Sequence, residues 1–174
     1  LASFLQKTAV INAGDGMKCI VDYTDSNVVY SSYQSGGLYR SDDGGATGQY
    51  IAPGPTSSFF NDYSLNPLNH NTLYAAYDEV YKSYDEGATW TQMTNALYPS
   101  GGGGYGMPIL AAPSDTNVIY LARMTNLYRS SDGGSTWTMV SLNLPSIALI
   151  SGMTVSSTDA NTVWLTISGY NSYS

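Results

Sequence analysis

The sequence is poor in charge, and above all in positive charge. Its 174 residues include six Lys and Arg against thirteen Asp and Glu, which gives a formal net charge of −7. Nucleic-acid binding needs cations to neutralise phosphates, and anionic membrane surfaces attract basic segments, so neither partner fits this balance. Neutral glycans and protein surfaces remain open as ligands.

Cysteine is almost absent, since Cys19 is the single copy and no internal disulfide can form. It stands in an apolar stretch between Met17 and Val21, so we expect a small core side chain. No apolar run approaches the ~20 residues of a membrane-spanning helix. Residues 1–10, LASFLQKTAV, lack the basic segment and cleavage site of a signal peptide. No zinc-ligand, phosphate-loop or dinucleotide spacing occurs, so we expect no metal and no cofactor.

Tyrosine and glycine are abundant, with 16 and 18 copies, and they favour an all-β chain of short strands and many turns. One octapeptide occurs three times: SDDGGATG at 41–48, SYDEGATW at 83–90 and SSDGGSTW at 130–137. Glycine provides the positive φ of a tight hairpin, and Asp, Ser and Thr side chains bond to turn amides. We assign this structural role to Ser41, Asp43, Gly45, Thr47, Ser83, Asp85, Gly87, Thr89, Trp90, Ser130, Asp132, Gly134, Thr136 and Trp137.

A second motif, Asn-x-x-aromatic, starts at Asn27, Asn71, Asn117 and Asn161. Both motifs recur at a period of roughly 45 residues, which is typical of a propeller or a solenoid. Each unit contains four candidate strands, the pattern of one β-propeller blade.

The sequence therefore predicts an all-β β-propeller with blades of four antiparallel strands. The predicted blades are 14–57, 58–100 and 101–145, followed by a half blade at 146–174, while 1–13 would end a preceding blade. Because propellers close with about 4–8 blades, we expect a fragment of a larger propeller that pairs with the remaining blades. Alone, such a fragment would expose two blade faces and be prone to instability or self-association.

The tryptophans that end the second and third octapeptides are expected to pack between blades. The first copy has Gly48 at that position. We expect this unit to be less well packed than the others, unless Tyr50 compensates.

The octapeptides resemble the Asp-box, or bacterial neuraminidase repeat, although Gly48 departs from the pattern. With GDGM at 14–17 and PSDTNVIY at 113–120, the fuller unit is similar to secreted bacterial sortilin-like and xyloglucanase-like propellers. The resemblance implies an extracellular or cell-surface propeller whose ligand face lies opposite the Asp-box turns. It does not define the function, because enzymes and non-enzymes share the repeat.

On that opposite face, Asp15 and Asp62 begin adjacent predicted blades. A glycosidase needs two carboxyl groups about 5–10 Å apart, so this pair is the candidate catalytic set, with turn capping or plain solvation as the alternative. Exposed aromatic side chains are good platforms for glycans and peptides. The candidate ligand-binding residues are Tyr33, Phe59, Phe60, Tyr77, Asp78, Tyr105 and Tyr170.

Sialidase chemistry is disfavoured. In the sialidase family three arginines grip the substrate carboxylate, and this chain has only Arg40, Arg123 and Arg129. Arg40 and Arg129 directly precede octapeptides, on the opposite rim, where surface packing is expected of them. His70 lacks any partner pattern for catalysis or metal binding, so we expect a solvated turn residue.

These observations favour a secreted or cell-surface propeller that acts as a binding or adhesion scaffold for a glycan or protein ligand. A glycoside hydrolase with part of its site outside this chain is the alternative. A sortilin-like peptide receptor is a third possibility.

Overall fold

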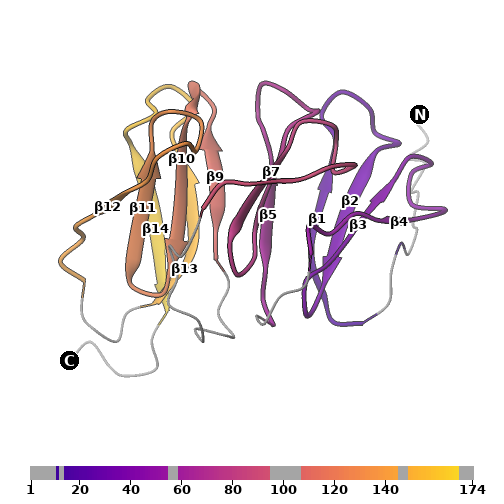
Figure 1. The fold of residues 1–174 in the computed structure, drawn as a ribbon, viewed down its shortest axis with the longest axis horizontal. Helices are drawn as coiled ribbons and strands as arrows, with labels where there is room; N and C mark the ends of the chain where they lie inside the picture. Colours follow the sequence, from indigo (N-terminus) through magenta and orange to yellow (C-terminus); the bar gives the residue numbers. More distant parts are fainter. Residues whose placement is uncertain (1–10, 12–13, 55–58, 95–106, 145–148, 169–174) are drawn as a thin grey trace, which may run out of the picture.

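The computed structural model describes residues 11, 14–54, 59–94, 107–144 and 149–168, and every regular element in these ranges is a β-strand. Within them, no helix is long and apolar enough to cross a membrane. The strands form four antiparallel sheets in chain order (Figure 1). The first sheet contains β1 (Gly16–Val21), β2 (Val29–Tyr33), β3 (Gly37–Ser41) and β4 (Gln49–Tyr50); the second contains β5 (Asp62–Leu65), β6 (Leu73–Ala76), β7 (Val80–Ser83) and β8 (Thr91–Gln92). The third contains β9 (Ile109–Ala112), β10 (Asp115–Arg123), β11 (Asn126–Ser130) and β12 (Thr138–Val140); the fourth contains β13 (Leu149–Val155) and β14 (Val163–Ser168).

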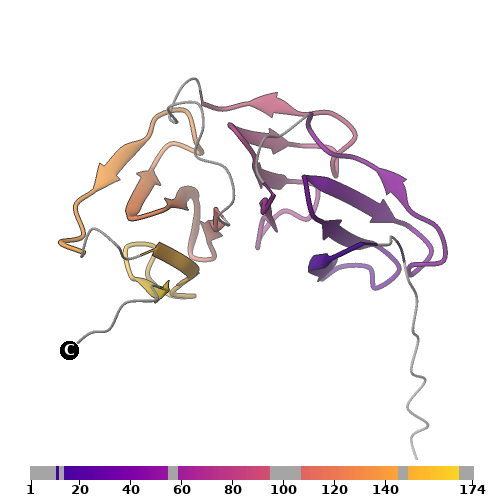
Figure 2. The ribbon, with the colours of Figure 1, turned by 90° about the horizontal axis from the view of Figure 1, so that it is seen from below.

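The four sheets stand side by side in an open arc (Figure 2). The first strands of successive sheets, β1, β5, β9 and β13, contact one another on the inner, concave side of the arc. The short strands β4, β8 and β12 lie on the convex side. This is the arrangement of propeller blades, and it confirms the predicted fold class of four-stranded antiparallel blades in a partial β-propeller.

The core is divided among the boundaries between blades. Because the second sheet lies between the first and the third and is covered on both faces, its strand β6 is buried along its whole length. One hydrophobic cluster joins the first and second blades, another the second and third, and a third the third and fourth. Their central side chains are Tyr30, Tyr63 and Leu73 in the first cluster, Tyr74, Ile109 and Leu121 in the second, and Val118, Tyr120 and Ile150 in the third.

The octapeptides form the hairpin turns between the third and fourth strands of the blades. In the third copy, the Ser130 hydroxyl accepts a hydrogen bond from the Gly134 amide and donates one to Asp132, each at 2.8 Å. The Thr136 amide and hydroxyl donate to the two oxygens of Asp132 at 2.8 and 2.6 Å. The other two copies repeat these bonds, and the glycine two residues after the aspartate has a φ near +93 to +98° in all three. One turn geometry therefore explains the residue pattern that the three copies in this chain share.

Each octapeptide tryptophan packs toward the preceding blade. The Trp90 indole donates a 2.7 Å hydrogen bond to the Ile51 carbonyl of the first blade, and Trp137 packs against the cluster between the second and third blades. At Gly48 the space that a side chain would enter is taken by Ile11, whose Cγ2 lies 2.5 Å from the position of a Cβ. Tyr50 contacts Tyr39 edge-on and is mostly exposed, so Ile11 rather than Tyr50 occupies this place.

The expectation that Cys19 is a core residue is wrong, because its side chain is exposed. Cys19 alternates along β1 with Ile20, which packs against the cluster with the second blade, so it faces away from that blade. No described blade covers this face. Val21 is 52% exposed on it, and Trp164 is 56% exposed in the fourth sheet at the other end of the arc. Both ends thus present apolar side chains, as a fragment of a larger ring should.

The turn aspartates are expected to make the stability of the fold depend on pH in the acid range. Hydrogen bonds from the Thr136 hydroxyl and amide and from Ser130 lower the pKa of Asp132 to about 2, against 3.8 for a free side chain. The same types of bond lower the pKa of Asp43 and of Asp85. Since the folded pKa is depressed, the stabilisation is complete above pH about 4 and is lost as the pH falls toward about 2.

We therefore expect the Asp132 carboxyl to titrate near pH 2 in a ¹³C NMR titration of the folded chain. The substitution Thr136→Val, which removes the donating hydroxyl, should move that midpoint upward toward 3.8. An ordinary midpoint in the unaltered chain would contradict this description of the turn.

Candidate functional site

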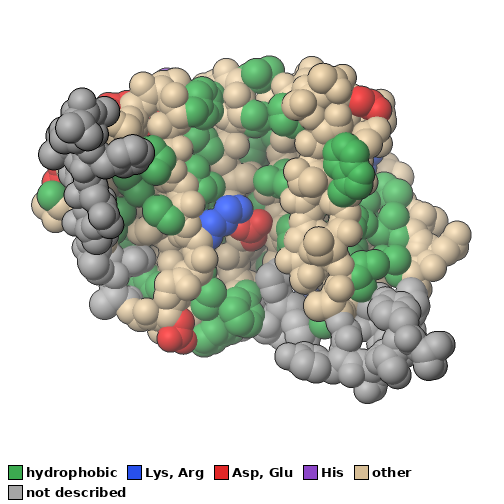
Figure 3. Space-filling view, turned by 180° about the vertical axis from the view of Figure 1, so that it is seen from behind, with side chains coloured by type: hydrophobic (Ala, Val, Ile, Leu, Met, Phe, Trp, Pro, Cys, Tyr) green, Lys and Arg blue, Asp and Glu red, His purple; other side chains and the backbone are tan. Residues whose placement is uncertain are grey.

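A cavity of about 350 Å³ opens on the concave side of the arc, where the first strands of the four sheets begin. Figure 3 shows this face, with one group of basic and acidic side chains in its middle and hydrophobic side chains around it. All four sheets or the segments before them contribute to the lining. The main lining side chains are Met17, Lys18, Phe60, Asp62, Met107 and Met153.

The charged centre of the cavity is an ion pair between two blades. Lys18 Nζ on β1 lies 2.7 Å from Asp62 Oδ1 on β5, and it also donates a 2.7 Å hydrogen bond to the Tyr63 carbonyl. The second oxygen of Asp62 accepts a 3.2 Å hydrogen bond from the Ile109 amide of the third blade. Asp62 therefore connects three successive blades, and both of its oxygens are engaged by donors of the protein.

Apart from Asn61 and Ser151, the rest of the lining is apolar. Phe60 is 41% exposed and meets Phe59 edge-on, with ring centroids 4.9 Å apart. The Phe59 carbonyl accepts a 2.9 Å hydrogen bond from the Ser35 amide, which ties this segment to the first blade. Methionine side chains of the first, third and fourth blades complete the wall. An exposed ring beside flexible thioethers can adapt to ligands of different shape.

The two predicted catalytic carboxylates have different surroundings. Asp62 lines the cavity, whereas Asp15 is exposed and does not, and its amide donates a 2.7 Å hydrogen bond to the Gln34 side chain. Among the described residues that line the cavity, Asp62 is the single carboxylate. No group of three or more His, Cys, Asp or Glu side chains in the described ranges could hold a metal ion.

Neither Tyr77 nor Tyr33, two of the predicted ligand-binding tyrosines, lines the cavity. Tyr77 is buried in the cluster between the first two blades, and its hydroxyl donates a 2.6 Å hydrogen bond to the Gly36 carbonyl, so its ring offers no surface to a ligand here. Burial raises the pKa of the Tyr77 hydroxyl. Tyr33 is half-buried over Gly37, with its ring 5.8 Å from that of Tyr39, on the outward face of the first blade.

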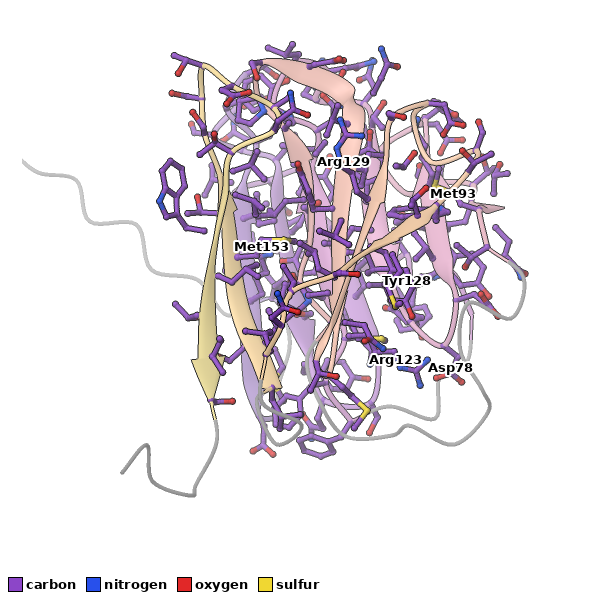
Figure 4. All side chains as sticks on the ribbon, turned by 90° about the vertical axis from the view of Figure 1, so that its left-hand side faces the viewer. Asp78, Met93, Arg123, Tyr128, Arg129 and Met153 are labelled. Atoms are coloured by element: carbon purple, nitrogen blue, oxygen red, sulfur yellow. The ribbon has the colours of Figure 1, made fainter. Side chains whose placement is uncertain are left out.

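Asp78 is exposed in the turn between β6 and β7. In Figure 4 it lies with Arg123 at the end of the sheets opposite to Arg129. This is the end expected to carry the ligand face, and both residues lie outside the cavity lining. Tyr105, Tyr170 and the glycine-rich loop at 101–106 lie outside the described residues.

At the octapeptide end, the cations before the turns cross from one blade to the next. Arg40 pairs with Asp42 of its own turn and with Glu86 of the second blade, while Arg129 donates a 2.9 Å hydrogen bond to the Asn161 side chain of the fourth sheet. These contacts agree with the packing role that we expected for Arg40 and Arg129.

His70 lies in a turn with its side chain 37% exposed, and it also has acidic neighbours that the sequence did not indicate. Its Nδ1 lies 3.2 Å from Asp22 of the first blade and 3.5 Å from Glu86 of its own blade. Burial alone would raise the pKa of Asp22, but hydrogen bonds from Thr24 and the interaction with His70 lower it below its usual value.

The sequence interpretation missed Lys18 and the methionines of the cavity. A signal for Lys18 does exist, because Lys18 and Asp62 occupy the same position of successive repeats, as do Pro108 and Gly152. The equivalent positions of neighbouring blades meet at the axis of a propeller. Opposite charges at one such position therefore indicate an ion pair between blades.

These features define a class, an arc of propeller blades with a cavity on its concave side. No protein-family model matches the chain, and no curated protein matches it. Solved structures do match. The ancestral GH74 enzyme AFV00434 superposes with a TM-score of 0.69 and 18% identity over 92% of this chain, and the GH74 enzyme of Niastella koreensis with 0.68 and 23% identity over 87%. YCF48 bound to D1 peptide gives 0.60 and 15% identity over 82%.

These likenesses establish the β-propeller fold. The chain spans 23% and 26% of the lengths of the two GH74 chains and 44% of the YCF48 chain. Its blades therefore match a fragment of each larger propeller.

Proposed function

We propose that this chain is part of a secreted or cell-surface β-propeller that binds a glycan or protein ligand in the concave cavity, as a binding or adhesion scaffold. The cavity volume of about 350 Å³ falls within the range of ligand sites in proteins. The chemistry of its wall, an exposed ring and thioethers around one ion pair, suits binding. The low content of charged residues and the resemblance to Asp-box propellers support the extracellular placement.

The observation that carries this proposal is the state of Asp62. A glycosidase needs one carboxyl group to give a proton to the leaving oxygen and a second to act as base or nucleophile. Both oxygens of Asp62 accept hydrogen bonds from Lys18 and Ile109, and no second described carboxylate lines the cavity. The arrangement favours a role for Asp62 in holding Lys18 and the neighbouring blades in place over a role in catalysis.

A glycoside hydrolase is the second candidate, because a carboxylate does line the cavity and GH74 enzymes share the fold. In that case the second acid would come from other blades. YCF48, which was solved bound to a D1 peptide, supports a peptide as the third type of ligand.

The exposed ring in the cavity provides the test of binding. A screen of neutral glycans, xyloglucan included, and of extended peptides first identifies the ligand. We expect Phe60→Ala to lower the affinity for that ligand about tenfold, because a stacked ring contributes roughly 0.5–1.5 kcal/mol beyond its buried area. Phe59→Ala is the matched control. That ring lies next to Phe60 but does not line the cavity, so the loss should be smaller. Affinity measured by titration calorimetry that stays unchanged in Phe60→Ala would exclude the cavity as the binding site.

A further inference from the structure

A second cavity lies on the opposite end of the blades, between the octapeptide turns of the second and third blades. Its volume is about 230 Å³, and Lys82, Tyr84, Thr91, Met93, Gly133 and Ser135 contribute to its lining. The Met93 side chain forms its apolar floor, in contact with Gly134. The concave cavity described above shares no residue with it.

The side chain of Lys82 dominates this cavity. Its ammonium lies 4.7 Å from the centre of the Tyr84 ring and 5.4 Å from that of Tyr74, and it donates a single 3.3 Å hydrogen bond to the Gly133 carbonyl. No carboxylate of the described residues pairs with it. Lys82 thus keeps donor capacity for an incoming anion.

At the boundary between the first and second blades, the equivalent cation has the acidic partners that Lys82 lacks. There Arg40 takes the place of Lys82, and it pairs with Asp42 in its own turn and Glu86 in the next turn. At the second boundary the equivalent positions hold Tyr84 and Gly133. Two acidic partners are therefore replaced by an aromatic ring and a hydrogen atom, which leaves a cation beside an open space.

We propose that this cavity binds a uronic acid unit of an acidic polysaccharide. The sugar carboxylate would take the place that Glu86 holds at the first boundary and pair with Lys82. The Tyr84 ring, which belongs to a residue 63% exposed, provides a flat face for the apolar side of the sugar ring. A volume below the ~300 Å³ of typical drug-sized pockets suits one sugar unit.

The ring distinguishes this ligand from an acidic peptide. An aspartate or glutamate side chain would use Lys82 alone, whereas a uronic acid uses the ammonium and the ring together. The net charge of −7 gives an acidic ligand no general attraction to the protein. The attraction for the sugar carboxylate therefore comes from this one local cation, and the ring adds the preference for a sugar.

The test uses the full chain and tri-galacturonic acid, with binding measured by titration calorimetry. We expect Lys82→Gln and Gly133→Glu each to lower the affinity at least tenfold, the first by removing the cation and the second by supplying it with an internal partner. Gly133→Glu fits the backbone, because Glu86 at the equivalent position already has a φ of +60°, against +71° at Gly133. The amides of both residues also donate the same hydrogen bond, Glu86 to the Asn71 carbonyl and Gly133 to the Asn117 carbonyl. A Cβ at Gly133 would lie 3.8 Å from Lys82 Nζ, which directs the new carboxylate toward the ammonium. An amide NMR spectrum confirms that each variant is folded.

Lys82→Arg, which keeps the charge, should retain most of the affinity, and Lys18→Gln in the concave cavity should leave it unchanged. Equal affinity for the methyl ester of the trisaccharide would overturn the carboxylate assignment. Equal affinity for tri-glutamate would overturn the saccharide assignment. Absence of binding, or binding that is insensitive to Lys82→Gln, would overturn the site itself.

Discussion

Replacing Tyr63 with alanine should lower the free energy of unfolding by about 3–5 kcal/mol, the usual cost of deleting a buried aromatic side chain. Tyr63 is only 1% exposed and lies at the centre of the cluster between the first and second blades. The single proton of its hydroxyl is shared between the carbonyl oxygens of Lys18 and Tyr30, each at 3.0 Å, and the deletion leaves both carbonyls without this donor. Urea denaturation followed by tyrosine fluorescence and far-ultraviolet circular dichroism measures the change.

Tyr63→Phe is the matched control, because it keeps the ring and removes the hydroxyl alone. We expect a loss of about 1–2 kcal/mol for this variant. Hydrogen exchange should show faster exchange in β1 and β5 than in β9 and β10, since the weakened boundary separates the first blade from the rest. An alanine variant as stable as the unaltered chain would show that the blades do not depend on this contact.

The second large effect is expected at the octapeptide of the second blade. Trp90→Ala should cost about 3 kcal/mol, the lower end of the range for large aromatic deletions because the ring is half-buried. The ring packs against the cluster with the first blade, and its indole nitrogen donates to the Ile51 carbonyl at 2.7 Å. Thermal unfolding should show a lower midpoint, by roughly 2–4 °C for each kcal/mol in a chain of this size.

Trp90→Phe and Trp137→Phe separate the ring from its hydrogen bond. The Trp137 nitrogen bonds to Gly134 within its own turn, at 3.0 Å, so its loss leaves the contact between blades in place. We therefore expect Trp90→Phe to cost about 1 kcal/mol and Trp137→Phe less. The reverse order would mean that Trp90 does not join the two blades through Ile51.

Much of the fold could be predicted because its signals are local and repeated. A turn such as Ser130–Trp137 is determined by a few adjacent residues, since the Asp132 carboxylate bonds to atoms within four positions of itself. The period of the repeat then gives the number of strands in each blade. Gly48 showed that the first copy differs, but not that Ile11 occupies the space, because Ile11 lies far from it in sequence.

The candidate site was less predictable because it depends on which faces of the blades meet. Cys19 and Tyr63 occupy the same position of successive repeats, yet Tyr63 is buried against a preceding blade and Cys19 is exposed. Likewise Tyr77 is buried, while its equivalent Tyr33 remains at the outward face. The Asp62–Lys18 ion pair requires the relative positions of two blades, which residue types alone do not provide.

The most direct test of the proposed scaffold function is a combined measurement of binding and turnover on one neutral glycan. The account predicts saturable binding that is weakened by Phe60→Ala, with no release of reducing ends from the bound glycan over many hours. Asp62→Asn should lower the affinity through loss of the ion pair with Lys18, and this variant should also release no reducing ends. Release of reducing ends by the unaltered chain that disappears in Asp62→Asn would contradict the account and assign a hydrolase.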